Sequence, residues 1–348
     1  MHYKGITYDV GTLFVENRST RDEFDPSVMR REIDIIKNDL HCNAVRVCGQ
    51  DLARLRATAE YALTQGVAVW FSPLLVEATA EETLAYLAEC SGIAEELRQR
   101  FPQIVFVVGG ELSFFMKGIL KGEDLYARIR SFISLPGLLR HMLTGRRWPG
   151  KRLNAFLAKA EALVRERFHG QVTYASGPWE KVDWRLFDLV SVNYYRDGQN
   201  AKWYRQGLQQ YYKHGKPVAI TEFGCCTYEG AEAKGAAGWG IVDTSNARRK
   251  IKGGFLRSED TQARYLTELL DMFLQEPIEG SFVFNFASYN LPTDEDPEFD
   301  LDMASYGIVK VLPDGEKGAT YQDMPWEPKK AFRMVAEQYG KESHQLVG

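Results

Sequence analysis

The sequence is poor in the residues that build disulfide frameworks and metal centres. Its 348 residues include only five cysteines, an odd number, and the adjacent pair Cys225 and Cys226 makes a poor disulfide framework for a secreted protein. No histidine stands near this pair to generate a thiolate, so we expect buried, unreactive thiols. The six histidines are dispersed, with no His-x-His or His-Glu-x-x-His spacing. We therefore expect no zinc site and no other metal or cofactor.

Signals for a membrane or for nucleic acid are also missing. The chain begins Met1-His-Tyr-Lys-Gly, without the basic start and apolar core of a signal peptide. Its apolar runs are too short and too interrupted to span a bilayer. The formal net charge of −4 gives no reason to expect nucleic acid as the partner. These absences predict a soluble cytoplasmic protein.

The sequence has instead a regular alternation of two hydrophobic patterns. Apolar, β-branched runs predict strands at residues 5–10, 44–48, 67–75, 104–111, 171–176, 189–195, 218–222 and 281–287. Helical periodicity predicts helices at residues 27–40, 51–65, 81–101, 153–168, 201–214, 259–275 and 329–339. Eight strands with intervening helices predict one (β/α)₈ TIM barrel over residues 1–348. The rival, an open doubly wound sheet, would normally show a Gly-rich turn after its first strand, and Asp9-Val-Gly-Thr is not one.

Insertions are expected after strands four, seven and eight, on the face where a barrel builds its active site. Residues 113–152 are rich in Lys and Arg, and residues 293–302 are densely acidic. Their opposite charges predict that the two segments attract each other and form a lid. Contact of 113–152 with an anionic membrane or a partner is an alternative. The acidic segment lacks the spacing and glycine of an EF-hand loop, so we expect a solvated loop.

Two glutamates stand at the ends of apolar runs that are typical of buried strands. Glu111 follows Ile104-Val-Phe-Val-Val-Gly-Gly, and Glu222 follows Val218-Ala-Ile-Thr. A charge there is costly unless the strand has just emerged at a polar rim. The C-terminal ends of barrel strands converge, and two carboxyls about 5–5.5 Å apart are the apparatus of retaining glycoside hydrolysis. We assign Glu111 as general acid/base and Glu222 as nucleophile. For either alone, a rim carboxylate in a salt bridge is the alternative.

Short motifs around these residues resemble clan A retaining glycoside hydrolases. Ile220-Thr-Glu-Phe-Gly resembles the Ile-Thr-Glu-x-Gly signature around the clan's nucleophile, whose partner glutamate ends strand four. Asn193-Tyr-Tyr is similar to the Asn-Tyr-Tyr of the clan's β-glucosidases, in which the second Tyr donates a hydrogen bond to the nucleophile. The match implies this role for Tyr195. Arg46 resembles the strand-two Arg that supports the nucleophile's charge. The resemblance implies a carbohydrate substrate.

The sequence departs from the clan at two places. Most members have Asn before the acid/base, where it binds the sugar 2-hydroxyl, and this chain has Gly110. Val108-Gly-Gly-Glu-Leu looks like the Gly-x-Glu-Leu of a small group of endo-β-mannanases that also lack this Asn, which implies a manno-configured ring. On strand eight, where members often supply a Trp platform, this chain offers Phe286. Both departures leave open a barrel that binds carbohydrate or protein without turnover.

Four further side chains are candidates for sugar contacts. Asp9, at the end of strand one, could bind a sugar hydroxyl or cap the following loop. Trp179 and Tyr289 follow strands five and eight and could stack on a pyranose ring. Trp239, in the Gly-rich loop after strand seven, could fold over the pocket. For each aromatic, packing in the core or in a loop is an equally common fate. The whole pattern predicts a retaining hydrolase of β-linked glycosides.

Overall fold

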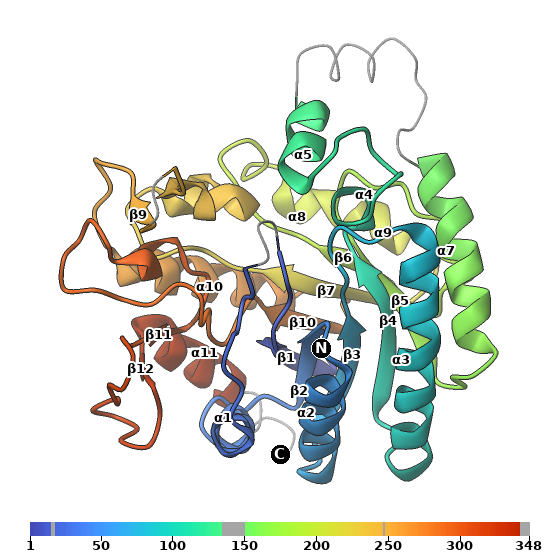
Figure 1. Ribbon diagram of the computed structural model, residues 1–348, viewed down its shortest axis with the longest axis horizontal. Coiled ribbons are helices and arrows are strands. Elements are labelled where there is room, and N and C mark those ends of the chain that lie inside the picture. The colour runs from blue at the N-terminus through green and yellow to red at the C-terminus, as the bar shows by residue number, and fades with distance from the viewer. Residues whose placement is uncertain (15–17, 134–149, 246–247, 342–348) are drawn as a thin grey trace.

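The computed structural model describes residues 1–14, 18–133, 150–245 and 248–341, and its centre is a closed barrel of eight parallel strands (Figure 1). The strands are β1 (Tyr3–Asp9), β2 (Ala44–Gly49), β3 (Ala68–Pro73), β4 (Ile104–Gly110), β5 (Gln171–Ser176), β6 (Val190–Asn193), β7 (Val218–Phe223) and β10 (Gly280–Val283). They follow one another around the barrel in chain order, with β10 closing between β7 and β1. The predicted (β/α)₈ fold is confirmed.

Helices cover the outside of the barrel and follow the predicted periodicity in all but one place. The long helices are α1 (Pro26–Asn38), α2 (Leu52–Thr64), α3 (Ala80–Arg100), α7 (Gly150–Arg165), α10 (Glu259–Leu274) and α11 (Lys330–Lys341). The helix expected over 201–214 is instead two short turns, α8 (Tyr204–Gly207) and α9 (Gln209–Tyr212). Gly207 is a poor helix former, and the Tyr194 hydroxyl occupies the space that a Cβ at 207 would need.

The interior of the barrel is filled by apolar side chains, so it is a packed core and not a pore. Its buried members are Ala44, Trp70, Val105, Val107, Ala175, Leu189, Ala219 and Phe282. The Trp70 and Phe282 rings lie 4.8 Å apart, and Phe282 packs directly over Gly5. A Cβ built on Gly5 would lie 2.3 Å from the Phe282 ring, so only glycine fits there. The ionisable residues Glu111 and Glu222 lie instead at the C-terminal ends of strands β4 and β7.

The acidic segment forms no ion pair with the described residues of the basic insertion, so the lid stays a prediction. Its carboxylates form ion pairs with residues that follow β7 and with one residue before α11: Asp294 with Arg248, Glu298 with Lys250, Asp300 with Arg257, and Asp302 with Arg257 and Lys329. The physical reason is topology. Segments after β7 and β10 leave neighbouring strands, whereas 113–152 leaves β4 on another side of the barrel.

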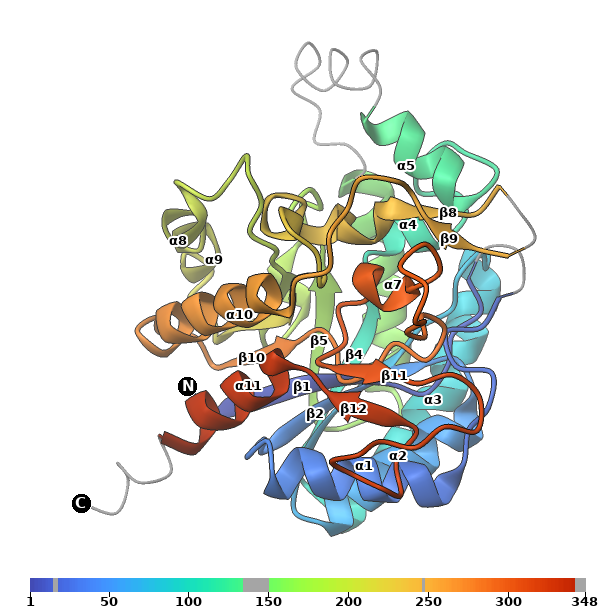
Figure 2. The same ribbon diagram turned by 90° about the vertical axis from the view of Figure 1, so that its left-hand side faces the viewer.

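The basic insertion begins with two helices, α4 (Leu112–Phe115) and α5 (Leu125–Ile133), beyond the C-terminal ends of the strands (Figures 1 and 2). The fully buried Arg128 fastens α5 in place: its guanidinium donates to the Phe114 carbonyl over 2.5 Å and to Glu77 over 2.8 Å. Residues 134–149 lie outside the described residues. No helix in the described part of the chain is long and apolar enough to cross a membrane.

Gly5→Ala should destabilise the fold, because the added methyl overlaps Phe282 in a core that cannot expand. Overpacking of this kind costs about 1–3 kcal/mol of unfolding free energy, which urea denaturation would measure. Gly253→Ala is the matched control, since nothing lies within 4 Å of its built Cβ. Equal stability of the two variants would contradict the packing argument.

Candidate active site

The two glutamates approach each other at the C-terminal end of the barrel. Glu111 directly follows β4, and Glu222 lies near the end of β7. Between them, on β6, Asn193 is the register partner of Glu222 and donates its amide N–H to Glu111 Oε1 over 3.0 Å. The side-chain oxygen of Asn193, Oδ1, accepts a hydrogen bond from the Thr221 hydroxyl at 2.8 Å, which orients the side-chain amide. One side chain therefore connects the ends of strands four and seven.

Glu222 accepts a hydrogen bond on each of its two carboxyl oxygens. Arg46 Nη1 lies 2.6 Å from Oε1, and the Tyr195 hydroxyl donates to Oε2 over 3.2 Å. The Arg46 side chain is 3% exposed and that of Glu222 is 16% exposed, so water screens the pair only weakly. Charge-assisted bonds of this kind are short and strong, and they fix the position of the Glu222 carboxyl group. Both contacts are those that the resemblance implied for Arg46 and Tyr195.

Glu111 has a strained backbone. Its φ of 44° and ψ of 39° lie in the left-handed region, which is unusual for a residue with a Cβ. Its N–H donates to the Ala175 carbonyl over 3.0 Å, and its carbonyl accepts from Phe114 at 2.8 Å. Strain of this kind persists only where the surroundings determine the conformation, and it is concentrated at functional sites.

The environment of Glu111 favours its neutral form. Burial, and then the negative charge of Glu222, raise the pKa of Glu111 to about 8. The Asn193 hydrogen bond and the positive charge of Arg46 oppose this rise. Because Oε1 accepts from Asn193, Oε2 is the oxygen free to carry the proton. At neutral pH the site thus presents a protonated carboxyl beside an ion-paired carboxylate.

A further buried carboxyl group, that of Glu180, supports the chain just after Glu111, and no sequence motif indicated it. Its Oε1 accepts from the Ser113 N–H at 3.0 Å, and its Oε2 accepts from the Tyr174 hydroxyl at 2.8 Å. The same hydroxyl accepts from the Leu112 N–H at 2.8 Å. Burial raises the pKa of Glu180, and its proximity contributes to the raised pKa of Glu111. A glutamate in a loop after strand five matches no motif.

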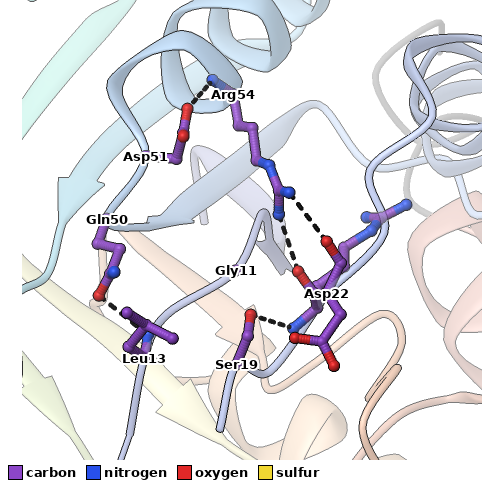
Figure 3. Close-up of a pocket in the computed structure, with 8 residues that line it drawn as sticks. Gly11, Leu13, Ser19, Asp22, Gln50, Asp51 and Arg54 are labelled. Carbon is purple, nitrogen blue, oxygen red and sulfur yellow. Dashed lines mark hydrogen bonds between the residues drawn. The ribbon is translucent and has the colours of Figure 1, made fainter. Parts of the chain in front are cut away.

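Asp9 faces the same end of the barrel and caps its own loop. Its Oδ1 accepts from the Gly11 N–H at 3.0 Å, and burial raises its pKa. Next to this loop is a hollow of about 240 Å³, lined by Gly11, Leu13, Ser19, Arg21, Asp22, Gln50, Asp51 and Arg54 (Figure 3). Arg54 spans it and donates to the carbonyls of Arg21 and Asp22 at 2.8 and 3.0 Å. This guanidinium therefore fastens the loop after β1 to α2.

Two of the expected sugar contacts are corrected by the structure. Phe286 is 1% exposed and packs against Trp326, with ring centroids 5.3 Å apart, so it offers no platform. The regular strand ends at Val283, and the chain beyond it turns Phe286 into the outer core. The Tyr289 hydroxyl donates to the buried Glu32, and the Arg21 guanidinium lies 4.0 Å from its ring centroid. Phe286 is therefore not available for stacking, and the Arg21 guanidinium already lies over the Tyr289 ring.

The two tryptophan candidates have different surroundings. Trp179 donates its indole N–H to the Ser113 hydroxyl over 3.0 Å and packs at 4.7 Å on Phe114, so it supports the base of the basic insertion. Trp239 lies in the 3₁₀ turn η4 (Gly235–Ile241), is 43% exposed, and has its ring 6.2 Å from that of Tyr126 on α5. Of the two, Trp239 is the more accessible.

The remaining polar groups give no indication of a metal or thiol site. Cys225 and Cys226 are buried, as expected, and burial raises the pKa of both thiols. Within the described ranges, no group of three His, Cys, Asp or Glu side chains is arranged to hold a metal ion.

Several solved structures are similar to this chain along its length. A GH113 β-1,4-mannanase matches with a TM-score of 0.61 at 14% identity, over 98% of this chain and 99% of that chain. The GH113 β-mannanase AaManA from Alicyclobacillus acidocaldarius matches with a TM-score of 0.59 at 16% identity, over 98% of both chains. A β-glucuronidase from Ruminococcus gnavus matches with a TM-score of 0.52 at 13% identity, over 97% of this chain and 49% of that one. No family model matches the sequence, and no curated protein matches it significantly. At these identities the similarity shows a shared TIM-barrel fold.

Proposed function

We propose that this protein is a retaining glycoside hydrolase that acts on β-linked glycosides or oligosaccharides. The observation that supports this best is the contrast between the two glutamates. Glu222 is paired with Arg46 and Tyr195, whereas burial raises the pKa of Glu111 to about 8. A neutral acid and an ionised nucleophile are the two groups that double displacement requires at the same pH.

The reaction takes place in two steps. Glu111 donates its proton to the glycosidic oxygen while a Glu222 oxygen attacks the anomeric carbon, so the C–O bond to the leaving group breaks as the glycosyl ester forms. Glu111, now ionised, removes a proton from water, which attacks the same carbon and frees Glu222. Arg46 and Tyr195 keep Glu222 charged and aimed, and Asn193 orients Glu111.

A manno-configured substrate is the more specific form of the proposal. Gly110 removes the amide that most of the clan uses at the 2-hydroxyl, and two of the similar structures are described as β-mannanases. We place the enzyme in the cytoplasm, with a carbohydrate substrate and no nucleic-acid partner. Membrane contact through 113–152 remains a separate hypothesis, which liposome co-sedimentation would test.

A binding module without turnover is the rival, and the buried Phe286 in place of an exposed strand-eight Trp favours it. A 2-fluoroglycoside separates the two hypotheses, because it traps the glycosyl ester of a retaining enzyme. Mass spectrometry showing stoichiometric label on Glu222 supports the hydrolase. Binding without label supports the module.

Glu222→Ala should abolish turnover, because no nucleophile remains. Loss of a nucleophile typically costs at least about 10⁴-fold in kcat. Azide should restore part of the activity by entering the vacated space and yield a glycosyl azide of inverted anomeric configuration, detectable by NMR. Undiminished hydrolysis in this variant would refute the assignment.

Activity should fall as pH rises through about 8, because Glu111 must carry a proton to act as acid. Glu111→Ala should remove this basic limb and reduce hydrolysis of substrates with poor leaving groups by about 10²–10⁴-fold. The first step on activated aryl glycosides should be spared, since these need no proton. Equal losses on both substrate types would contradict the acid role.

Trp239→Ala should raise KM for oligosaccharides by about three- to tenfold, the loss expected for one aromatic contact. Hydrolysis of a small aryl monosaccharide, which has fewer sugar rings to make contacts, should change less. The matched control is Trp203→Ala, which removes another exposed indole, 65% exposed, before α8. Identical effects of the two substitutions would exclude a specific contribution of Trp239.

A further inference from the structure

Arg46 uses only part of its guanidinium to hold Glu222. Nη1 donates to Glu222 Oε1 and to the Thr221 carbonyl, and Nε donates to the Ser72 hydroxyl over 3.2 Å. Nη2 has no hydrogen-bond acceptor among the residues that the structure describes. A guanidinium group has five N–H donors, so two charged N–H groups in this site have no protein acceptor.

Nη2 faces the backbone next to Glu111. A Cβ built on Gly110 would lie 3.3 Å from Nη2 and 3.5 Å from the Ala175 Cβ. A side chain at position 110 would therefore cover Nη2, and glycine leaves it uncovered. The charge of Arg46 also acts on Glu111, whose pKa it lowers. Nη2 thus lies at the end of the barrel where both carboxyls act.

We propose that Arg46 Nη2 donates a hydrogen bond to the C2 hydroxyl of the sugar ring that Glu222 attacks, and that Gly110 is required to leave this donor uncovered. The inference rests on the proposed hydrolase function and deepens it. The anomeric carbon must meet a Glu222 oxygen, and C2 is one bond away from it. Nη2 belongs to the same rigid, planar group whose Nη1 already contacts Glu222.

The proposal gives Arg46 a part in substrate specificity. A charge-assisted hydrogen bond is stronger than one from a neutral amide, and losing its partner leaves a charged donor unsatisfied. The enzyme should therefore favour a glycoside with a free C2 hydroxyl over its 2-deoxy analogue by about 10- to 100-fold in kcat/KM.

Gly110→Ala tests the inference, because Nη2 is the atom nearest to the added methyl. With an aryl β-mannoside, kcat/KM should fall about tenfold or more. With the 2-deoxy analogue, after subtraction of spontaneous hydrolysis, it should stay within about twofold, which also shows that the variant is folded. Gly253→Ala should change neither substrate. Equal losses on both substrates, or a wild type without preference, would overturn the inference.

Arg46→Lys provides a second variant, since lysine keeps the positive charge near Glu222 but has no second nitrogen. Hydrolysis of both substrates should be slower, and the ratio of kcat/KM for the substrate with the C2 hydroxyl to that for the 2-deoxy analogue should fall towards one. An unchanged preference would overturn the inference by itself.

A binding experiment separates this inference from the proposed function. 1-Deoxymannojirimycin and fagomine differ in carrying or lacking the C2 hydroxyl, and calorimetry gives Kd for each. If the wild type hydrolyses nothing but binds the first more tightly, and Gly110→Ala removes the difference, the inference holds while the hydrolase proposal fails. Equal affinity for the two, or binding of neither, would overturn the inference.

Discussion

The buried ion pair between Arg46 and Glu222 is the interaction on which the rest of the site depends. It joins β2 to β7 across the barrel, with Ser72 on β3 as a further acceptor. Removing either charge would leave the other buried and unpaired, which is strongly destabilising. Its negative member is also part of the reason why Glu111 is neutral at pH 7. The ion pair that stabilises the barrel therefore also contributes to the raised pKa of Glu111.

The apolar packing inside the barrel stabilises the fold and so offsets the cost of burying this ion pair. Trp70 and Phe282 pack against each other in the barrel interior, and Phe282 fits there because Gly5 has no side chain. Glu111 and Glu222 lie at the C-terminal ends of the strands, where they are partly buried but hydrogen-bonded. Burial together with specific hydrogen bonds and charges is the condition under which pKa values move furthest from their usual ranges.

The sequence predicted those features that follow from periodicity and from motifs at strand ends. The eight strands, Glu111 and Glu222 lie where the alternation of strands and helices predicted them. Arg46 and Tyr195 contact Glu222, as the resemblance to clan A glycoside hydrolases implied. Phe286 was misplaced because a period of two cannot foresee that regular pairing ends at Val283. Glu180 was missed because its importance arises from contacts with Ser113 and Tyr174 made only in three dimensions. The partners of the acidic segment depend on which strands are neighbours in the barrel, and the charge composition of the loops does not predict this.

The attachment of α5 through Arg128 limits which parts of the basic insertion can be replaced without affecting Glu111. Arg128 bonds to Phe114, which in turn donates to the carbonyl of Glu111, so the start of the insertion and the strained glutamate share one short chain of contacts. An exchange of the whole segment between related barrels would therefore disturb Glu111 itself. A graft that retains residues 111–128 would instead keep these contacts to Glu111.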